Sequence, residues 1–206
     1  MHEYQSLASD VVYTGRVISV RRDIVAMPGG TSSQRDVVVH PGAVAVLAFQ
    51  DGQVLLVTQY RHPVGDRLDE IPAGLLDIDG EPAWVAARRE LVEEAGYEAA
   101  TWNVLIDLWT SPGMTDEAIR VYLARDLTPC VRDVQEHEEL EMTSHWRPLV
   151  DAVADALGGR LTNGVAVAGV LAAQAAATTG FVGLRPVTAP WPARPQAGDL
   201  GAKANT

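Results

Sequence analysis

Residues 74–97 read GLLDIDGEPAWVAARRELVEEAGY, and this stretch predicts a loop that leads into a helix. Pro82 suits a first helical position, and the acidic Glu81 lies beside the positive N-terminal end of that helix. Gly96 can adopt the left-handed conformation that ends many helices. At about 100° per residue, the apolar residues form one stripe that faces a core: Trp84, Ala87, Leu91 and Ala95.

Three carboxylates lie beside that apolar stripe, on Glu90, Glu93 and Glu94. A solvated helix face would account for them simply, but Glu90 and Glu94 are like charges four residues apart and repel each other. Arg89 can pair with Glu93, which still leaves excess negative charge. A hard divalent cation removes that cost, because Mg²⁺ binds carboxylate oxygens and water. From the spacing alone, a metal site and a charged surface are both open interpretations.

Composition limits the class of function. Of 206 residues, 47% are hydrophobic and 21% are charged, which is typical of a soluble globular protein. The net charge of −11 argues against nucleic acid or an anionic membrane as a partner. An acidic protein that acts on phosphates needs cations between the two, which agrees with the metal interpretation.

Cysteine content and leader signals indicate the compartment. Cys130 is the only cysteine, so no internal disulfide can form. The first residues show no basic segment followed by an apolar run, so we expect a cytoplasmic protein. The apolar segment after Asn163 is too short to span a bilayer and contains Gln174, which favours a buried packing helix.

The remaining patterns predict a mixed α/β fold in three parts. Residues 1–40 should form a small antiparallel sheet with little core of its own. Residues 41–185 should form the main domain, with a hairpin turn at Asp51-Gly52 and helices over 149–157 and 163–179. Strands are expected over 43–49, 54–59, 104–109 and 118–124. Residues 186–206 are rich in Pro, Ala, Gly and Asp, which predicts a disordered tail.

The stretch 74–97 resembles the Nudix box of hydrolases that act on nucleoside diphosphates linked to another moiety. The match lies in Gly74, Glu81 and the run Arg89-Glu90-Leu91-x-Glu93-Glu94-x-Gly96. Here one residue more than usual separates Gly74 from Glu81, and Tyr97 stands at a position that is usually aliphatic. The resemblance implies a Nudix α/β/α sandwich, here preceded by the small N-terminal sheet.

A second feature resembles one branch of that family. Pro112 lies fifteen residues past Tyr97, the offset that marks the ADP-ribose pyrophosphatases. This resemblance implies hydrolysis of ADP-ribose to AMP and ribose 5-phosphate, with two or more Mg²⁺ or Mn²⁺ ions per site. It also implies a homodimer, with the N-terminal sheet placed across a two-fold axis.

The same resemblance assigns roles to individual residues. Metal would be held by the backbone carbonyl of Ala73 and the carboxylates of Glu90, Glu93 and Glu94. A glutamate of the acidic run 135–141 would take a proton from the attacking water, and Glu139 is preferred by position over Glu138. Substrate contacts are assigned to five further residues: Arg35, Arg61, Gly74, Met114 and Glu117.

Three alternatives stay open at this point. The chain could hydrolyse another nucleoside diphosphate sugar, since Pro112 favours ADP-ribose without enforcing it. It could also bind ADP-ribose and regulate another process without cleaving it, although such modules tend to lose box carboxylates that this chain retains. A structural protein with an incidental acidic helix would have to explain both the box and the proline.

Overall fold

The computed structural model describes residues 3–132 and 141–194, which fall into two compact units. Unit 1 holds the described N-terminal residues through Gly42 together with Trp109–Ala118, Ala193 and Arg194. Unit 2 consists of Ala43–Leu108 and Ile119–Pro192.

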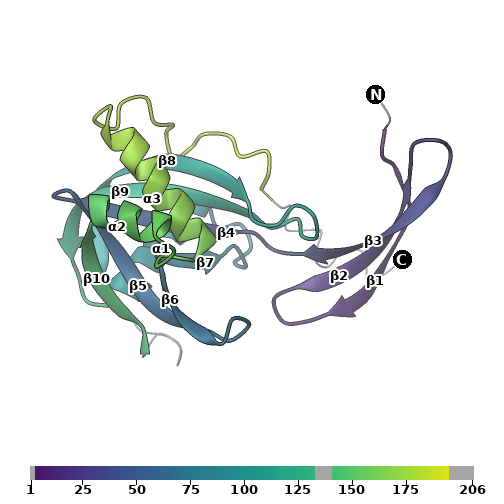
Figure 1. The fold of residues 1–206 in the computed structure, drawn as a ribbon, viewed down its shortest axis with the longest axis horizontal. Helices are drawn as coiled ribbons and strands as arrows, with labels where there is room; N and C mark the ends of the chain where they lie inside the picture. The colour runs from purple at the N-terminus through teal and green to yellow at the C-terminus, as the bar shows by residue number, and fades with distance from the viewer. Residues whose placement is uncertain (1–2, 133–140, 195–206) are drawn as a thin grey trace. The chain divides into compact units, whose positions relative to one another are not determined.

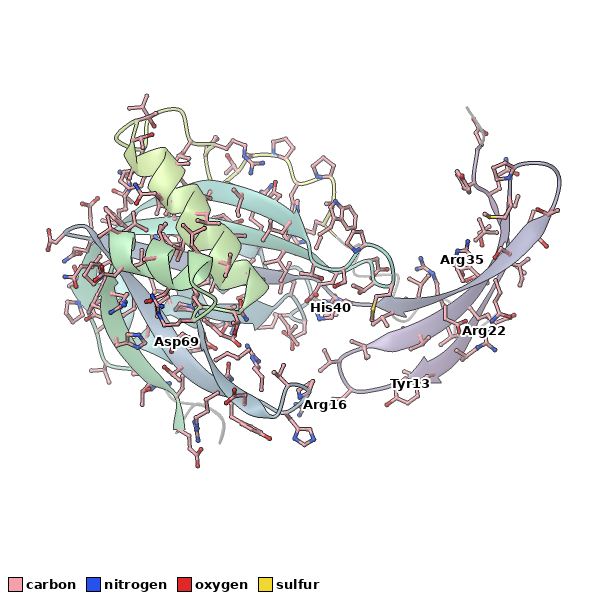
Figure 2. The ribbon with its side chains drawn as sticks, viewed as in Figure 1. Tyr13, Arg16, Arg22, Arg35, His40 and Asp69 are labelled. Carbon is pink, nitrogen blue, oxygen red and sulfur yellow. The ribbon has the colours of Figure 1, made fainter. Side chains whose placement is uncertain are left out.

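Unit 1 is built on a three-stranded antiparallel sheet (Figure 1). Its strands are β1 (Ser6–Thr14), β2 (Ser19–Ala26) and β3 (Ser32–Val39), in the order β1-β2-β3. Every residue of β1 is exposed, including Tyr13, which Figure 2 labels. The sheet therefore lacks a core of its own within the described chain, as the sequence predicts for so small a sheet.

Unit 2 contains a seven-stranded mixed sheet. Its main path is β10 (Thr143–Pro148), β5 (Gln53–Arg61), β4 (Ala43–Gln50), β9 (Ala118–Pro129) and β8 (Tyr97–Trp109). Two short strands complete it: β6 (Asp66–Glu70) pairs with β5, and β7 (Ala73–Leu75) pairs with β4. Because β4 and β9 run parallel while β4 pairs with β5 and β5 with β10 in antiparallel fashion, the predicted mixed α/β class is confirmed.

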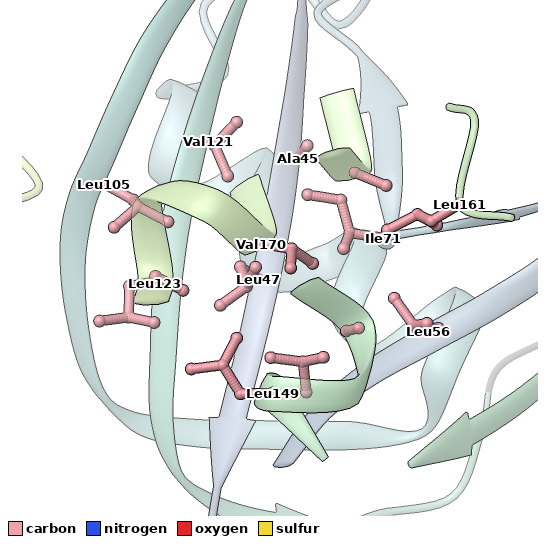
Figure 3. Packing of buried hydrophobic residues seen from close by; sticks show 14 of the residues in the cluster. Ala45, Leu47, Leu56, Ile71, Leu105, Val121, Leu123, Leu149, Leu161 and Val170 are labelled. Atoms are coloured by element: carbon pink, nitrogen blue, oxygen red, sulfur yellow. The ribbon is translucent and has the colours of Figure 1, made fainter. Parts of the chain in front are cut away.

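Helices cover both faces of this sheet. Alternate residues of a strand point to opposite faces, so Val44, Val46 and Ala48 of β4 pack with α1 (Ala83–Ala95). The intervening Ala45 and Leu47 pack with α2 (Leu149–Leu157) and α3 (Gly164–Ala177). Figure 3 shows Leu47 of β4 among side chains that include Val170 of α3 and Leu149 of α2. The result is the expected α/β/α sandwich.

Local signals set several element ends as predicted. Asp51 and Gly52 both have positive φ, at 52° and 77°, as the hairpin turn between β4 and β5 requires. Asn163 caps α3, because its side-chain oxygen accepts a hydrogen bond from the backbone N–H of Ala166 at 2.9 Å. Gly96 ends α1 with φ 70° and ψ 38°.

Other details differ from the expectation. Pro82 is the residue before the helix, in an extended conformation, and α1 begins at Ala83. The short strands β6, β7 and β10 are additional to the predicted set.

No helix in the described ranges is long and apolar enough to cross a bilayer.

The segment 186–192 also differs from the tail predicted from residue 186. The guanidinium of Arg120 donates hydrogen bonds to the carbonyl oxygens of Ala189 at 2.8 Å and Pro190 at 3.0 Å. The same guanidinium lies 4.9 Å from the ring centroid of Trp191, within the range of a cation–π contact. These contacts make the segment part of unit 2.

Candidate active site

The turn before α1 brings a helix side chain into contact with the backbone. Strand β7 pairs with β4, which fixes Ala73 opposite Ala45 and Gly74 opposite Val44. A Cβ atom at position 74 would lie 1.9 Å from Oε1 and 2.1 Å from Cδ of Glu90. Any side chain at Gly74 would therefore collide with Glu90, and glycine permits the close approach.

Two of the three predicted metal-binding carboxylates are buried on α1. Glu90 and Glu94 are each 8% exposed, and they lie one turn apart. The Oε2 atom of Glu94 accepts a hydrogen bond from the backbone N–H of Ala73 at 2.8 Å. Simple solvation of a charged helix face is therefore excluded for these two residues. The structure brings them together with Ala73 and Gly74.

Arg89 joins the other carboxylates of the helix and its approach. Its Nη1 donates to Oε1 of Glu90 at 2.7 Å and to Oε2 of Glu93 at 2.9 Å. Its Nε and Nη2 lie 3.3 Å and 3.2 Å from the two carboxylate oxygens of Glu81. Glu81 thus belongs to the same cluster, despite the longer loop that precedes it.

The hairpin of β5 and β6 contributes a second arginine and a carboxylate that the sequence analysis did not select. Arg61 donates from Nε and Nη2 to the two oxygens of Glu70, at 2.8 Å and 2.6 Å. Glu70 is 4% exposed. In the sequence, Glu70 could be noticed only by its position just before the Pro72-Ala73-Gly74 turn. Its segment is too short to show the alternation of apolar and polar residues that marks a strand. We refer to Glu70, Glu81, Glu90, Glu93, Glu94, Arg61 and Arg89 as the acidic cluster.

Burial changes the ionisation of Glu94. Loss of solvent, together with the nearby charges of Glu90 and Glu70, raises the pKa of the Glu94 carboxyl to about 8. The N–H of Ala73 and the guanidinium of Arg61 act in the opposite direction. With no cation bound, Glu94 therefore carries a proton at neutral pH.

The acidic cluster fits a divalent cation by its chemistry. Five carboxylates face two guanidinium groups, so negative charge is in excess, and all the donors are hard oxygens of the kind Mg²⁺ and Mn²⁺ prefer. Within the described part of the chain, no three acidic, His or Cys side chains already converge as a metal site. Glu90 is instead held by Arg89, and Glu94 by Ala73. A cation would replace those partners and the proton on Glu94.

Three of the predicted substrate-binding residues belong to unit 1. Arg35 of β3, labelled in Figure 2, donates from Nη1 to the hydroxyl of Ser33 and to the carbonyl oxygen of Gln34 at 2.8 Å. The carbonyl oxygen of Met114 accepts from the backbone N–H of Val38 at 2.8 Å.

Glu117 lies in the same unit and is held by two neighbours. It accepts a hydrogen bond from the Thr110 hydroxyl, and its Oε1 lies 3.4 Å from Nε2 of His40.

The predicted general bases, Glu139 and Glu138, lie outside the described residues.

Comparison with known proteins places this geometry in a family. The NUDIX domain model matches residues 39–164, which include the whole acidic cluster. An ADP-ribose pyrophosphatase of Mycobacterium tuberculosis is 48% identical over 197 residues, 95% of each chain. An ADP-ribose pyrophosphatase of Bacillus subtilis is 40% identical over 143 residues, 68% of this chain and 77% of its own.

A solved structure supports the fold. The crystal structure of an ADP compounds hydrolase superposes with a TM-score of 0.77 at 22% sequence identity, covering 88% of this chain and 98% of its own. At that identity the likeness concerns the fold alone.

The raised pKa of Glu94 predicts a pH dependence of stability in the metal-free protein. Between pH 4.5 and about 8 the unfolded Glu94 is ionised while the folded one keeps its proton. The folded state then binds more protons, so the free energy of unfolding should fall as pH rises through this window. Urea unfolding in EDTA at several pH values measures the slope, which Glu94→Gln should reduce. Glu93→Gln serves as the matched control on the same helix, and equal slopes for wild type and Glu94→Gln would contradict the prediction.

Proposed function

Because the chain belongs to the Nudix family, we propose that it hydrolyses the pyrophosphate of ADP-ribose to give AMP and ribose 5-phosphate. The observation that carries this proposal is the pair of buried carboxylates, Glu90 and Glu94, packed against the Ala73-Gly74 backbone. The chain retains Glu90, Glu93 and Glu94, whereas regulatory modules without catalysis tend to lose box carboxylates. The choice of ADP-ribose is supported by the ADP-ribose pyrophosphatase of Mycobacterium tuberculosis, which is similar over nearly the full length of both chains.

Nudix hydrolases generally need divalent metal ions, and the acidic cluster supplies suitable oxygens. We propose that the carbonyl of Ala73 and the carboxylates of Glu90 and Glu94 hold two or more Mg²⁺ or Mn²⁺ ions, with Glu93 beside them. When bound, such ions neutralise charge that develops on a diphosphate and lower the pKa of coordinated water. Arg61 then offers its planar fork to phosphate or sugar oxygens.

The reaction joins a water oxygen to one phosphorus and breaks the bond from that phosphorus to the bridging oxygen. We propose Glu139 as the general base that takes the proton of the attacking water, with Glu138 as the alternative. Gly74 has no side chain, which lets Glu90 approach the backbone closely. Substrate contacts by Gly74 and by the unit 1 residues Arg35, Met114 and Glu117 are part of the same proposal.

Unit 1 supports the proposal of a homodimer. Strand β1 exposes several large apolar side chains: Leu7, Val11, Val12 and Tyr13. A sheet that exposes apolar residues on a strand without buried positions gains stability when a second copy covers it. A cytoplasmic location stays a prediction from the sequence.

A substrate assay tests the proposed reaction. With Mg²⁺ or Mn²⁺, chromatography should show AMP and ribose 5-phosphate formed in equal amounts from ADP-ribose, and EDTA should abolish both. ADP-glucose, UDP-glucose and GDP-mannose form the comparison panel, and kcat/KM for ADP-ribose should exceed theirs by about tenfold or more, because polar recognition of the adenosine and ribose discriminates strongly. A higher kcat/KM for another nucleotide sugar would favour that alternative. Binding without turnover would favour the regulatory module.

Paired substitutions test the general base. Glu139→Gln should lower kcat about 10²- to 10⁴-fold, the usual contribution of general base catalysis, while KM changes little. Glu138→Gln is the matched control from the adjacent position and should keep most of the activity. The reverse pattern would assign the base to Glu138.

Light scattering at micromolar concentration tests the homodimer. The mass should be twice the 22.1 kDa of one chain. Val12→Asp, on exposed β1, should shift the mass toward the monomer because it places charge in the proposed interface. Val182→Asp alters a valine of unit 2 that is 79% exposed and should leave the mass unchanged. A monomer mass for the wild type would rule out the dimer.

A further inference from the structure

The side chain of Arg61 runs back along its own hairpin. In the register of β5 and β6, Arg61 lies opposite Asp66, whereas Glu70 lies opposite Val57. The guanidinium pairs with Glu70, four residues further along β6, while Oδ1 of the exposed Asp66 accepts from the backbone N–H of Arg67. Glu70 therefore draws the guanidinium along β6, away from the hairpin tip.

The pairing fixes both the position and the plane of the guanidinium. Nε and Nη2 donate to different oxygens of Glu70, at 2.8 Å and 2.6 Å, which is a two-point contact. The Glu70 side chain is 5% exposed while that of Arg61 is 41% exposed. A rigid, buried carboxylate thus holds an arginine that is open to solvent. Such support lowers the entropy cost of binding a ligand.

Both oxygens of Glu70 are used in this contact, so Glu70 has a partner without any cation. This distinguishes it from Glu94, which is buried in the same cluster and has one backbone N–H as its hydrogen-bond donor. A carboxylate that neutralises Arg61 also reduces its net attraction for any anion. Glu70 instead fixes the direction in which the Arg61 guanidinium points. That direction matters because the oxygens of a bound diphosphate have fixed positions.

We propose that Glu70 is a positioning residue for substrate binding, which holds Arg61 at the edge of the acidic cluster in the orientation that meets the diphosphate. In this role Glu70 orients Arg61 and touches neither substrate nor metal itself. This inference rests on the proposed function, in which Arg61 contacts the substrate.

A double-mutant cycle tests the inference. Glu70→Gln should raise KM for ADP-ribose about tenfold, the size expected for weakening one charge-assisted contact, with kcat within about threefold of wild type. Arg61→Gln should raise KM at least as much. In the Arg61→Gln background, Glu70→Gln should raise KM no further, because its only route of action is gone. Calorimetry should give the same Mn²⁺ affinity for Glu70→Asp, which keeps the negative charge, and wild type.

Two further variants keep the test specific. Asp66→Asn removes the exposed carboxylate opposite Arg61 and should leave KM and kcat unchanged. Glu70→Asp keeps the charge but is one methylene shorter, so it should also raise KM, and it replaces Glu70→Gln if the latter does not fold by circular dichroism.

The outcomes separate this inference from the proposed function. If the wild type does not cleave ADP-ribose, the proposed function fails. The double-mutant cycle is then measured as KM for the nucleotide sugar of the panel that is cleaved best, or as Kd for ADP-ribose. An unchanged or lowered KM in Glu70→Gln overturns the positioning role. Weaker Mn²⁺ binding in Glu70→Asp, or a further rise in KM when Glu70→Gln is added to Arg61→Gln, also overturns it, because either result gives Glu70 a role that does not pass through Arg61.

Discussion

The burial of Glu90 and Glu94 is the constraint on which the rest of this site depends. Two carboxylates four residues apart on one helix repel each other, and burial raises the cost of their charge. The structure offsets that cost in separate ways, through Arg89 beside Glu90 and through the Ala73 N–H and a proton on Glu94. Each of these partners is one that a divalent cation can replace, so the cluster is stable without metal yet suited to bind it.

The two faces of the unit 2 sheet are covered by different kinds of side chain. The face under α2 and α3 is packed with Leu, Val and Ala, and a Cβ at Gly169 of α3 would lie 3.2 Å from Cδ1 of Ile71. The face under α1 combines apolar packing with the acidic cluster. Ile71 directly follows Glu70 and packs on the opposite face, so close packing by α3 supports the backbone from which Glu70 reaches Arg61.

Arginine has three distinct uses in unit 2. Arg89 joins three carboxylates around the start and middle of α1, and Arg61 is directed by one buried carboxylate. Arg120 instead is itself buried, with Asp107 on one side and the carbonyl oxygens of Ala189 and Pro190 on the other. The first two lie in the acidic cluster, while the third attaches residues 186–192 to the sheet.

The sequence by itself determined the family resemblance, the mixed α/β class, the Asp51-Gly52 turn, the ends of α2 and the start of α3, because caps, turns and periodicity depend on neighbours in the chain. It also identified Glu90 and Glu94 through their spacing. Only the tertiary structure decided that these carboxylates are buried, that Glu81 and Glu70 join them, and that β6, β7 and β10 are strands. Those features depend on partners far along the chain: Glu94 meets a backbone N–H 21 residues away, and Arg120 meets carbonyl groups 69 and 70 residues away. Burial and charge pairing are properties of the packed chain, and a local pattern does not contain them.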